Sequence, residues 1–294
     1  MGTDDRQTRQ EQIRRGLRRW LLVLAGCVAM GAAATPEYFE PLIQRLVDDG
    51  FDGGQVAAVF DRSETEMAIE GVSLFFRHSE ARLDYDQFLR PGRVEKARQY
   101  LETHAADLAA AHARYKVAPE VITAILLVET NLGGMSGRQK VFNVLATMAA
   151  LEDQGSREAF WATMPTDRRI SRQKFDAKAD RKSRWAYLEL KALLKYVRRE
   201  NLDPLDLKGS YAGAMGYCQF MPSNALRLGV DGDGDGRVDL YTHADAIASV
   251  GNYLKHHGWR PDLNRKKRYR VILRYNYSKP YANTILKIAD KLKG

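Results

Sequence analysis

The sequence predicts a mostly α-helical fold. Apolar residues recur at three-to-four spacing along most of the chain, and Pro or Gly residues interrupt these patterns where helices would begin or end. The alternation of polar and apolar residues that is typical of strands is limited to the short run from Tyr269 to Leu273, and the sequence has no internal repeat. With 294 residues, 45% hydrophobic and 28% charged, the chain can form one large domain or two small ones.

Residues 1–34 have the composition of an export signal. Four arginines between residues 14 and 19 precede an apolar, Ala-rich segment, residues 20–34, that is too short to span a bilayer comfortably. Small residues at positions 32 and 34 favour cleavage after Ala34. Two alternatives remain: the run Leu24–Cys27 resembles a bacterial lipobox that would lipidate Cys27, or the segment is retained as an anchor.

Cysteine content and charge narrow the class of protein further. Removal of the signal would leave Cys218 as the only cysteine, so no intramolecular disulfide could form. The net charge is +9, and basic residues are dense in residues 168–184 and 255–274, which suggests contact with an anionic polymer or surface. For an exported protein we expect this to be the cell wall or an anionic membrane face and not nucleic acid. The alternative is that these side chains are only solvated.

Residues 37–115 are predicted to be helical. Two apolar stripes at helical spacing support this, one before and one after the break at Pro91-Gly92. The stripes consist of Phe39, Leu42, Ile43, Leu46 and Val47, and of Val94, Ala97, Leu101, Leu108 and Tyr115. Both are expected to be packing faces and not functional sites.

The run VAPEVITAILLVETNLGG, residues 117–134, predicts a buried helix with Glu129 in its last turn. Pro119 suits a first helical turn, Glu120 favours the positive helix N-terminus, and the Gly pair at 133–134 can supply the left-handed residue that ends a helix. Burial and the negative end of the helix dipole would both raise the pKa of Glu129. A carboxylic acid protonated near neutral pH can protonate a glycosidic oxygen; a structural Glu, hydrogen-bonded or paired with an Arg, is the alternative.

The next segments mix apolar and polar patterns. Residues 142–151 predict another apolar helix, while residues 154–182 are polar and basic with little periodicity and are expected to form a surface insertion. A helical stripe then returns and ends at the sequence Asn-Leu-Asp-Pro, residues 201–204. This stripe consists of Trp185, Leu188, Ala192 and Tyr196.

The Gly-rich stretch LKGSYAGAMGYCQFMPS, residues 207–223, is expected to form one wall of a groove. Glycines allow close backbone approach, and the hydroxyl, aromatic and amide groups of Ser210, Tyr217 and Gln219 suit sugar rings and their N-acetyl groups. An ordinary Gly-rich connection is the alternative. Residues 207–230 contain no Asp or Glu, so a mechanism with two carboxylates would need its second acid from elsewhere.

The run DGDGDGRVDLYTHAD, residues 231–245, has the opening of an EF-hand calcium loop. Its twelfth position, usually Glu, is Thr242, so we predict a longer loop that closes at Asp245. Oxygen ligands without a His or Cys cluster favour calcium, in a structural role, over zinc or copper; an acidic solvated turn is the alternative. The metal would hold the helix predicted at residues 244–257. The predicted ligands are Asp231, Asp233, Asp235, the carbonyl of Arg237 and Asp245.

Five motifs, in order along the chain, resemble those of the B-type membrane-bound lytic murein transglycosylases of Gram-negative bacteria. They are the Glu129 helix, the Gly-rich stretch, the acidic loop, SVGNYLKHHGW at residues 249–259 and RYNYSKPYA at residues 274–282. The resemblance extends from about Phe39 to the C-terminus.

The resemblance implies a lysozyme-like, largely helical core over residues 116–294 and an accessory N-terminal helical region over residues 35–115. It also implies a periplasmic enzyme that cleaves peptidoglycan glycan strands between N-acetylmuramic acid (MurNAc) and N-acetylglucosamine (GlcNAc), with Glu129 as the one catalytic glutamate. Outer-membrane attachment through a lipidated Cys27 would accompany the lipobox alternative. The implied groove residues are Ser210, Gln219, Tyr253, Tyr275, Asn276 and Tyr281, to which the Gly-rich stretch itself adds Tyr217.

Two features depart from that family. Its best-known form has a β-rich accessory segment where this chain has only residues 260–273. The basic stretch at residues 163–182 is longer than the family needs, and it could take over part of the glycan or peptide-stem contacts.

The expected chemistry uses one group twice. Protonated Glu129 would donate to the glycosidic oxygen and, as a carboxylate, would then remove the proton of the MurNAc 6-hydroxyl so that this oxygen attacks C1 and forms a 1,6-anhydro sugar. One alternative is a hydrolytic muramidase, for which Asp206 is the acid nearest in sequence to the Gly-rich stretch. Another is a non-catalytic, calcium-stabilised wall-binding protein in which Glu129 is structural.

Overall fold

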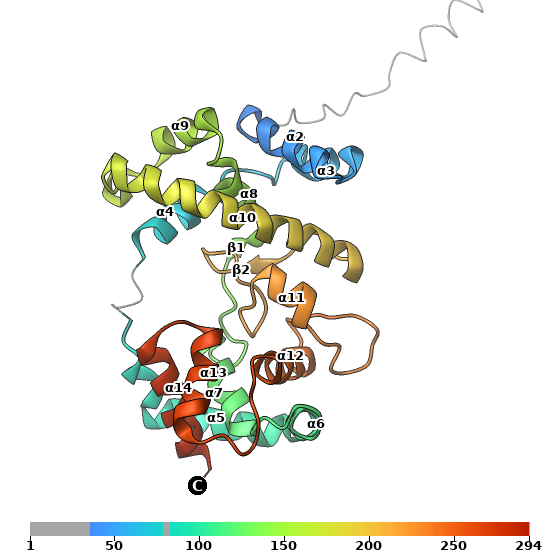
Figure 1. The fold of residues 1–294 in the computed structure, drawn as a ribbon, viewed down its shortest axis with the longest axis vertical. Helices are drawn as coiled ribbons and strands as arrows, with labels where there is room; N and C mark the ends of the chain where they lie inside the picture. Colours follow the sequence, from blue (N-terminus) through green and yellow to red (C-terminus); the bar gives the residue numbers. More distant parts are fainter. Residues whose placement is uncertain (1–35, 79–82, 294) are drawn as a thin grey trace, which may run out of the picture. The chain divides into compact units, whose positions relative to one another are not determined.

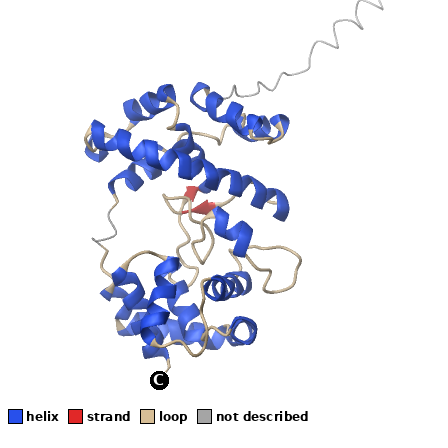
Figure 2. Ribbon diagram, in the orientation of Figure 1, coloured by secondary structure: helices blue, strands red, loops and turns tan. Residues whose placement is uncertain are grey.

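The computed structural model describes residues 36–78 and 83–293, and this part of the chain is mostly helical, as predicted (Figures 1 and 2). The predicted export signal, with Cys27 and Ala34, lies outside the described residues. None of the described helices is both long enough and apolar enough to cross a lipid bilayer.

One group of helices packs around a segment that is buried along its whole length, α8 (Val141–Ala150). The long helix α10 (Arg172–Glu200) lies against α8 over an extended contact. Around them are η1 (Glu37–Phe39), α2 (Glu40–Asp48), α3 (Gly53–Phe60), α4 (Ile69–Arg77), α9 (Gln154–Thr163) and η4 (Thr166–Arg168). Of these, η1, α2 and α4 contact α8, while α3 packs on α2 and α9 packs on η1.

A second group packs around α7 (Pro119–Thr130), the helix that carries Glu129. Its other members are η3 (Asp86–Leu89), α5 (Pro91–Thr103), α6 (Ala105–Tyr115), α12 (His243–His256), α13 (Arg265–Tyr275) and α14 (Lys279–Leu292). α5, α6, α12 and α14 all contact α7, and α13 packs on α12 and α14. The Glu129 helix is therefore the centre of a helical bundle (Figure 1).

Two short elements join the groups. α11 (Pro222–Leu228) contacts α10 on one side and α12 on the other. β1 (Gln139–Lys140) and β2 (Lys208–Gly209) pair antiparallel, with Gln139 opposite Gly209, and form the two strands in Figure 2. This pairing ties the segment before α8 to the start of the Gly-rich stretch.

The helices before residue 115 contact both groups, since α2 and α4 lie on α8 whereas α5 and α6 lie on α7. The division of residues 35–115 from residues 116–294 stays a prediction. Within these helices the predicted stripes are mostly buried: Phe39, Leu42, Leu46, Val94, Ala97, Leu108 and Tyr115 are in the core, whereas Val47 is 37% exposed.

The strand-like run from Tyr269 to Leu273 is helical, inside α13. The side chain of Asn264 caps this helix by accepting a hydrogen bond from the Lys267 backbone N–H. Arg and Lys, which favour helices, surround the run, and only Val271 and Ile272 are buried. The short alternation was therefore misleading, because helix propensity and the cap outweigh it.

The prediction that residues 154–182 form a surface insertion is wrong. It forms α9, η4 and the first part of α10, and the rings of Phe160 and Phe175 stack inside it with centroids 6.0 Å apart and both side chains fully buried. The stripe predicted further along α10 is partly wrong, because Leu188 is 60% exposed. α10 buries its neighbours Ala186, Leu190, Leu193 and Val197 instead.

Candidate active site

Glu129 lies half-buried in the last turn of α7. The helix ends at Asn131, two residues earlier than the Gly pair suggested, because Asn131, Leu132 and Gly133 all adopt left-handed backbone angles with φ of 52°, 62° and 85°. The Leu132 N–H donates to the Leu126 carbonyl at 2.9 Å, which closes the helix end. The chain thus turns away directly after Glu129 and leaves its carboxylate at the end of a buried helix.

A tyrosine hydroxyl from the end of the chain meets this carboxylate. Tyr281 Oη donates a hydrogen bond to Glu129 Oε1 at 2.6 Å. Tyr281 is 1% exposed and lies in the first turn of α14, which the Ser278 side chain caps. Burial, together with the nearby Glu129 carboxylate, raises the pKa of Tyr281 well above its ordinary value, so the hydroxyl remains a donor.

Two more tyrosines extend this contact into a cluster. The Tyr275 ring stacks on Tyr281 with centroids 6.4 Å apart, and the Tyr253 ring meets Tyr275 edge-on at 4.8 Å. Tyr275 Oη donates to the Cys218 carbonyl and Tyr253 Oη to the Arg274 carbonyl, both at 2.5 Å. Three groove residues implied by sequence resemblance, from α12, α13 and α14, therefore lie together beside Glu129.

The Gly-rich stretch reaches the same place through its backbone. The hydroxyl of Thr130, next to Glu129, donates to the Tyr217 carbonyl at 2.8 Å. Gln219 adopts a left-handed backbone with φ of 49°, and its amide donates to the carbonyls of Ser136 and Gly216 at 3.1 and 2.9 Å. Residues 207–223 thus form a fixed loop against the end of α7, and not a loose connection.

Ser210 and Asn276 are placed less directly. The Ser210 hydroxyl accepts hydrogen bonds from the backbone N–H groups of Ala212 and Ala214 at 3.2 and 3.1 Å, so it is oriented by its own loop. Asn276 is the C-cap residue of α13, directly after Tyr275. Their contact with a substrate stays a prediction.

Sequence reasoning missed two residues of this site. The Tyr85 ring, 7% exposed, meets Tyr281 edge-on with centroids 6.2 Å apart. Thr130 supplies the hydrogen bond that joins α7 to the Gly-rich stretch. A hydroxyl side chain at the end of an otherwise apolar helix was the available signal for Thr130, whereas Tyr85 is far from the other motifs in sequence.

The acidic loop brings three of its predicted ligands together. One carboxylate oxygen from each of Asp231, Asp233 and Asp245 lies within 4.8 Å of the others. Asp235 Oδ1 instead accepts the backbone N–H of Arg237 at 2.8 Å. Asp245 is 1% exposed, and burial raises its pKa to about 6. An all-oxygen donor set with a buried carboxylate fits calcium, because a cation would compensate the charge that burial penalises.

This loop is attached to the Glu129 site. The Asp239 N–H donates to Asp245 Oδ2 at 2.6 Å, and the next carbonyl, that of Leu240, accepts from the Tyr217 N–H at 2.8 Å. Tyr217 in turn is bonded to Thr130. A chain of hydrogen bonds therefore leads from the acidic loop to the residue beside Glu129.

The chain is similar to known proteins. The family model for the transglycosylase SLT domain matches residues 34–268. Membrane-bound lytic murein transglycosylase B of Escherichia coli (strain K12) is 35% identical over 173 residues, which cover 59% of this chain and 40% of that protein. The match thus spans less than half the length of this relative.

Solved structures show the same fold. Soluble lytic transglycosylase SltB1 from Pseudomonas aeruginosa aligns with a TM-score of 0.69 and 25% identity over 87% of this chain and 98% of that one. Escherichia coli lytic transglycosylase Slt35, in complex with calcium, aligns with a TM-score of 0.69 and 25% identity over 91% of this chain and 97% of that one. The lysozyme-like fold expected from the motifs is confirmed, and the chain belongs to the transglycosylase SLT domain family.

Proposed function

We propose that this protein is a lytic murein transglycosylase that cleaves peptidoglycan glycan strands between MurNAc and GlcNAc. The observation that carries the proposal is the Glu129 carboxylate at the end of a buried helix, bonded to Tyr281 within a cluster of tyrosines. Membership of the transglycosylase SLT domain family and the likeness to lytic transglycosylases support it.

In this proposal Glu129 acts first as an acid and then as a base. It protonates the glycosidic oxygen, the bond to C1 breaks, and the resulting carboxylate takes the proton of the MurNAc 6-hydroxyl as that oxygen bonds to C1. The products are a 1,6-anhydro-MurNAc end and a free GlcNAc 4-hydroxyl. Tyr281 keeps the carboxylate in place through its 2.6 Å hydrogen bond.

The surrounding residues would bind the strand. The partly exposed ring of Tyr275, which packs on the buried Tyr253, suits contact with a sugar ring, and Ser210, Gln219 and Asn276 offer hydroxyl and amide groups. Tyr217 supports this wall through its backbone bond with Thr130. The developing positive charge on the sugar would be stabilised by these oriented dipoles and by the Glu129 carboxylate.

Calcium in the 231–245 loop is part of the proposal. Asp231, Asp233 and Asp245 would hold the ion with carboxylate oxygens, with Asp235 and the Arg237 carbonyl as the further predicted ligands. The ion would neutralise this acidic cluster and hold the loop that supports Tyr217. The calcium complex of Slt35 supports this assignment.

We also propose a periplasmic location, which rests on the proposed peptidoglycan substrate and on the predicted export signal. Cleavage after Ala34 and lipidation at Cys27 predict different products, a shorter soluble chain or a lipid-bearing one. The mass of the mature protein purified from a Gram-negative host distinguishes the two.

Product analysis tests the proposed chemistry. Purified sacculi are digested in ¹⁸O-labelled water and the fragments are weighed. Capture of C1 by the 6-hydroxyl gives fragments one water lighter than lysozyme products, with no label at the cleaved end. Labelled reducing ends would instead establish the hydrolytic muramidase. Absence of any cleavage, with wall binding retained, would favour the non-catalytic alternative.

A further inference from the structure

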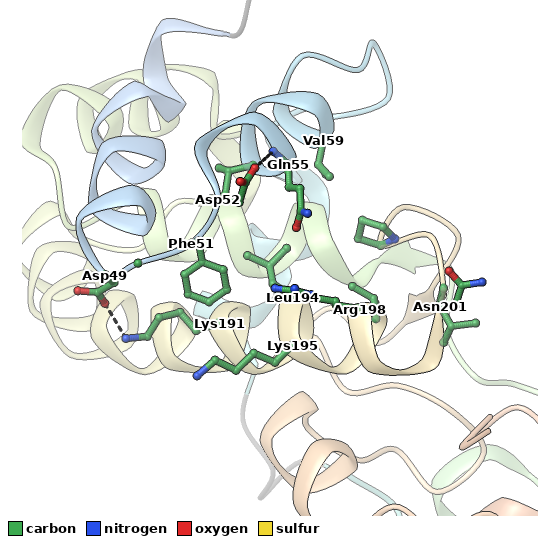
Figure 3. A pocket seen from close by; sticks show the side chains of 15 residues that line it. Asp49, Phe51, Asp52, Gln55, Val59, Lys191, Leu194, Lys195, Arg198 and Asn201 are labelled. Atoms are coloured by element: carbon green, nitrogen blue, oxygen red, sulfur yellow. Dashed lines mark hydrogen bonds and ion pairs between the residues drawn. The ribbon is translucent and has the colours of Figure 1, made fainter. Parts of the chain in front are cut away.

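A cavity of about 530 Å³ lies away from Glu129, between the connection from α2 to α3, α3 itself and the second half of α10 (Figure 3). Phe51, Val59 and Leu194 give it an apolar floor and are partly buried against the core. Its volume falls within the range of roughly 300–1,000 Å³ that small-ligand pockets occupy. None of the residues that line it belongs to the Glu129 site.

α10 contributes three cations to this cavity: Lys191, Lys195 and Arg198. Lys191 Nζ is neutralised by Asp49 at 2.7 Å. Lys195 and Arg198 are exposed, and no described carboxylate pairs with either of them. Lys195 Nζ lies 6.0 Å from the centroid of the Phe51 ring, so a charge and an apolar face are presented side by side.

Both acids that line the cavity are already bound within the protein. Asp49 also accepts a hydrogen bond from Tyr187 Oη at 2.9 Å, and Lys191 lowers its pKa. Asp52 caps α3 by accepting from the Gln55 N–H at 2.8 Å. The charges left for a ligand are therefore the two cations Lys195 and Arg198.

The charged face continues along α10 beyond the cavity. Arg184 and Leu188 follow the same three-to-four spacing as the three cations, which places all five side chains on one side of the helix. Leu188 is 60% exposed, and its place on this face explains why it is not in the core. From Arg184 to Arg198 the helix rises by fourteen steps of about 1.5 Å, so the stripe is about 21 Å long and suits an extended ligand.

We infer that this groove, lined by Phe51, Leu194, Lys195 and Arg198, is a second, non-catalytic site for the carboxylate-bearing peptide stems of peptidoglycan. The identity of the ligand rests on the proposed function. A stem carries several carboxylates between small alkyl groups, so the carboxylates can pair with Lys195 and Arg198 while the alkyl groups cover Phe51 and Leu194. A ligand that carries only phosphates could pair with the two cations but would leave Phe51 and Leu194 uncovered.

Binding here would hold the enzyme on the wall while the Glu129 site stays open to a glycan strand. Each contact is exposed, so the affinity for a single stem should be weak and should fall as salt increases. Many stems on one wall would compensate, since neighbouring stems keep the local concentration high.

The test is a calorimetric titration of the full chain with the free tetrapeptide stem, released from peptidoglycan by an amidase. We expect saturable, salt-sensitive binding that weakens at least about tenfold in the double variant Lys195→Gln/Arg198→Gln, because two charge-assisted contacts are lost. The matched control is Lys287→Gln/Lys291→Gln on α14, which also removes two exposed positive charges about one helical turn apart and should bind like the unmodified protein. Equal melting temperatures show that both variants are folded.

Absence of stem binding, or equal affinity in Lys195→Gln/Arg198→Gln, would overturn the inference. The inference would also be overturned if Lys195 and Arg198 bound anionic phospholipid vesicles, or an acidic protein segment such as polyglutamate, but did not bind the stem. This face of α10 would then have a different partner. The free stem has no glycosidic bond, so this titration is independent of cleavage. A failure to form anhydro products would overturn the proposed function and leave a positive titration standing.

Discussion

The end of α7 and the second half of α10 both carry glutamates that are at least partly buried, but the carboxylates of these glutamates have different hydrogen-bond partners. Glu189 and Glu200 of α10 are 7% and 5% exposed. Glu189 accepts from both the backbone N–H and the hydroxyl of Ser223, at 2.9 and 2.8 Å, and Glu200 accepts from the Val238 N–H at 2.8 Å and pairs with Arg199. Glu129 of α7 is less buried and accepts from the hydroxyl of a side chain, Tyr281.

This difference separates a structural glutamate from a catalytic candidate. A carboxylate that satisfies backbone donors fixes a helix start or a loop, and Glu189 does so for α11 while Glu200 does so for the middle of the acidic loop. Glu129 instead accepts from Tyr281, whose ring belongs to a cluster with Tyr275 and Tyr253. Burial alone would have selected Glu189 and Glu200 and not Glu129.

The largest effect is expected for Glu129→Gln. The amide keeps the volume and can still accept from Tyr281, but it cannot donate a proton as an acid, so turnover of sacculi should fall roughly 10²–10⁴-fold with the melting temperature nearly unchanged. Glu120→Gln, on the first turn of the same helix, is the matched control and should retain activity. Near-normal lysis by Glu129→Gln would return Glu129 to the structural class.

Calcium bound in the 231–245 loop should raise the melting temperature. An ion that binds only the folded chain stabilises it by about 2.7 kcal/mol at 100 times its dissociation constant, which calorimetry detects as a higher Tm. Asp245→Ala should abolish this calcium-induced shift, whereas the exposed Asp262→Ala should keep it. A full shift in Asp245→Ala would show that the loop does not close at residue 245.

Tyr281→Phe tests whether the Tyr281 hydroxyl holds the Glu129 carboxylate in place. It removes the hydroxyl and keeps the stacked ring, so the loss of one hydrogen bond to a charged group, about 1.5–3 kcal/mol, should lower kcat about tenfold or more. The control is Tyr115→Phe, since the buried Tyr115 hydroxyl has no hydrogen-bond partner among the described residues. Equal kcat values in the two variants would remove Tyr281 from the site.

Glu189→Ala should give the opposite outcome from Glu129→Gln. It leaves the Ser223 N–H and hydroxyl without their acceptor, which should cost about 1–3 kcal/mol in the free energy of unfolding measured by urea titration. Product chemistry should stay the same in the folded fraction. A stability equal to that of the unmodified protein would mean that water replaces the carboxylate at this position.

The smallest expected effect is on pH dependence. Burial, with His256, Arg227 and Arg274 nearby, lowers the pKa of His257 below its ordinary 6.5. As the pH falls, His257 of the unfolded chain therefore takes up a proton before His257 of the folded chain does. The contribution of this histidine to the free energy of unfolding is fully present above pH 6.5 and is lost as the pH falls from the unfolded pKa towards the folded one. Melting curves at pH 7.5 and 5 should differ less in His257→Gln, and an unchanged difference would contradict this.

Much of the site was predictable from local sequence. Glu129 stands out because a single carboxylate follows a run of apolar residues, and the acidic loop stands out because its ligands are adjacent in sequence. The long Gly-rich stretch is recognisable for the same reason. In each case the residues that define the feature lie within one short segment, so no knowledge of distant contacts is required.

Tertiary structure decided the rest. Tyr281 follows Glu129 by 152 residues, whereas Tyr85, which contacts Tyr281, precedes Glu129 in the sequence. No local sequence pattern could therefore join these residues. Tertiary packing also determined that Phe160 and Phe175 are core residues and that Leu188 is not. Sequence periodicity reports which residues can share a helix face, but only the packing of one helix on another determines which face is buried and which side chains meet.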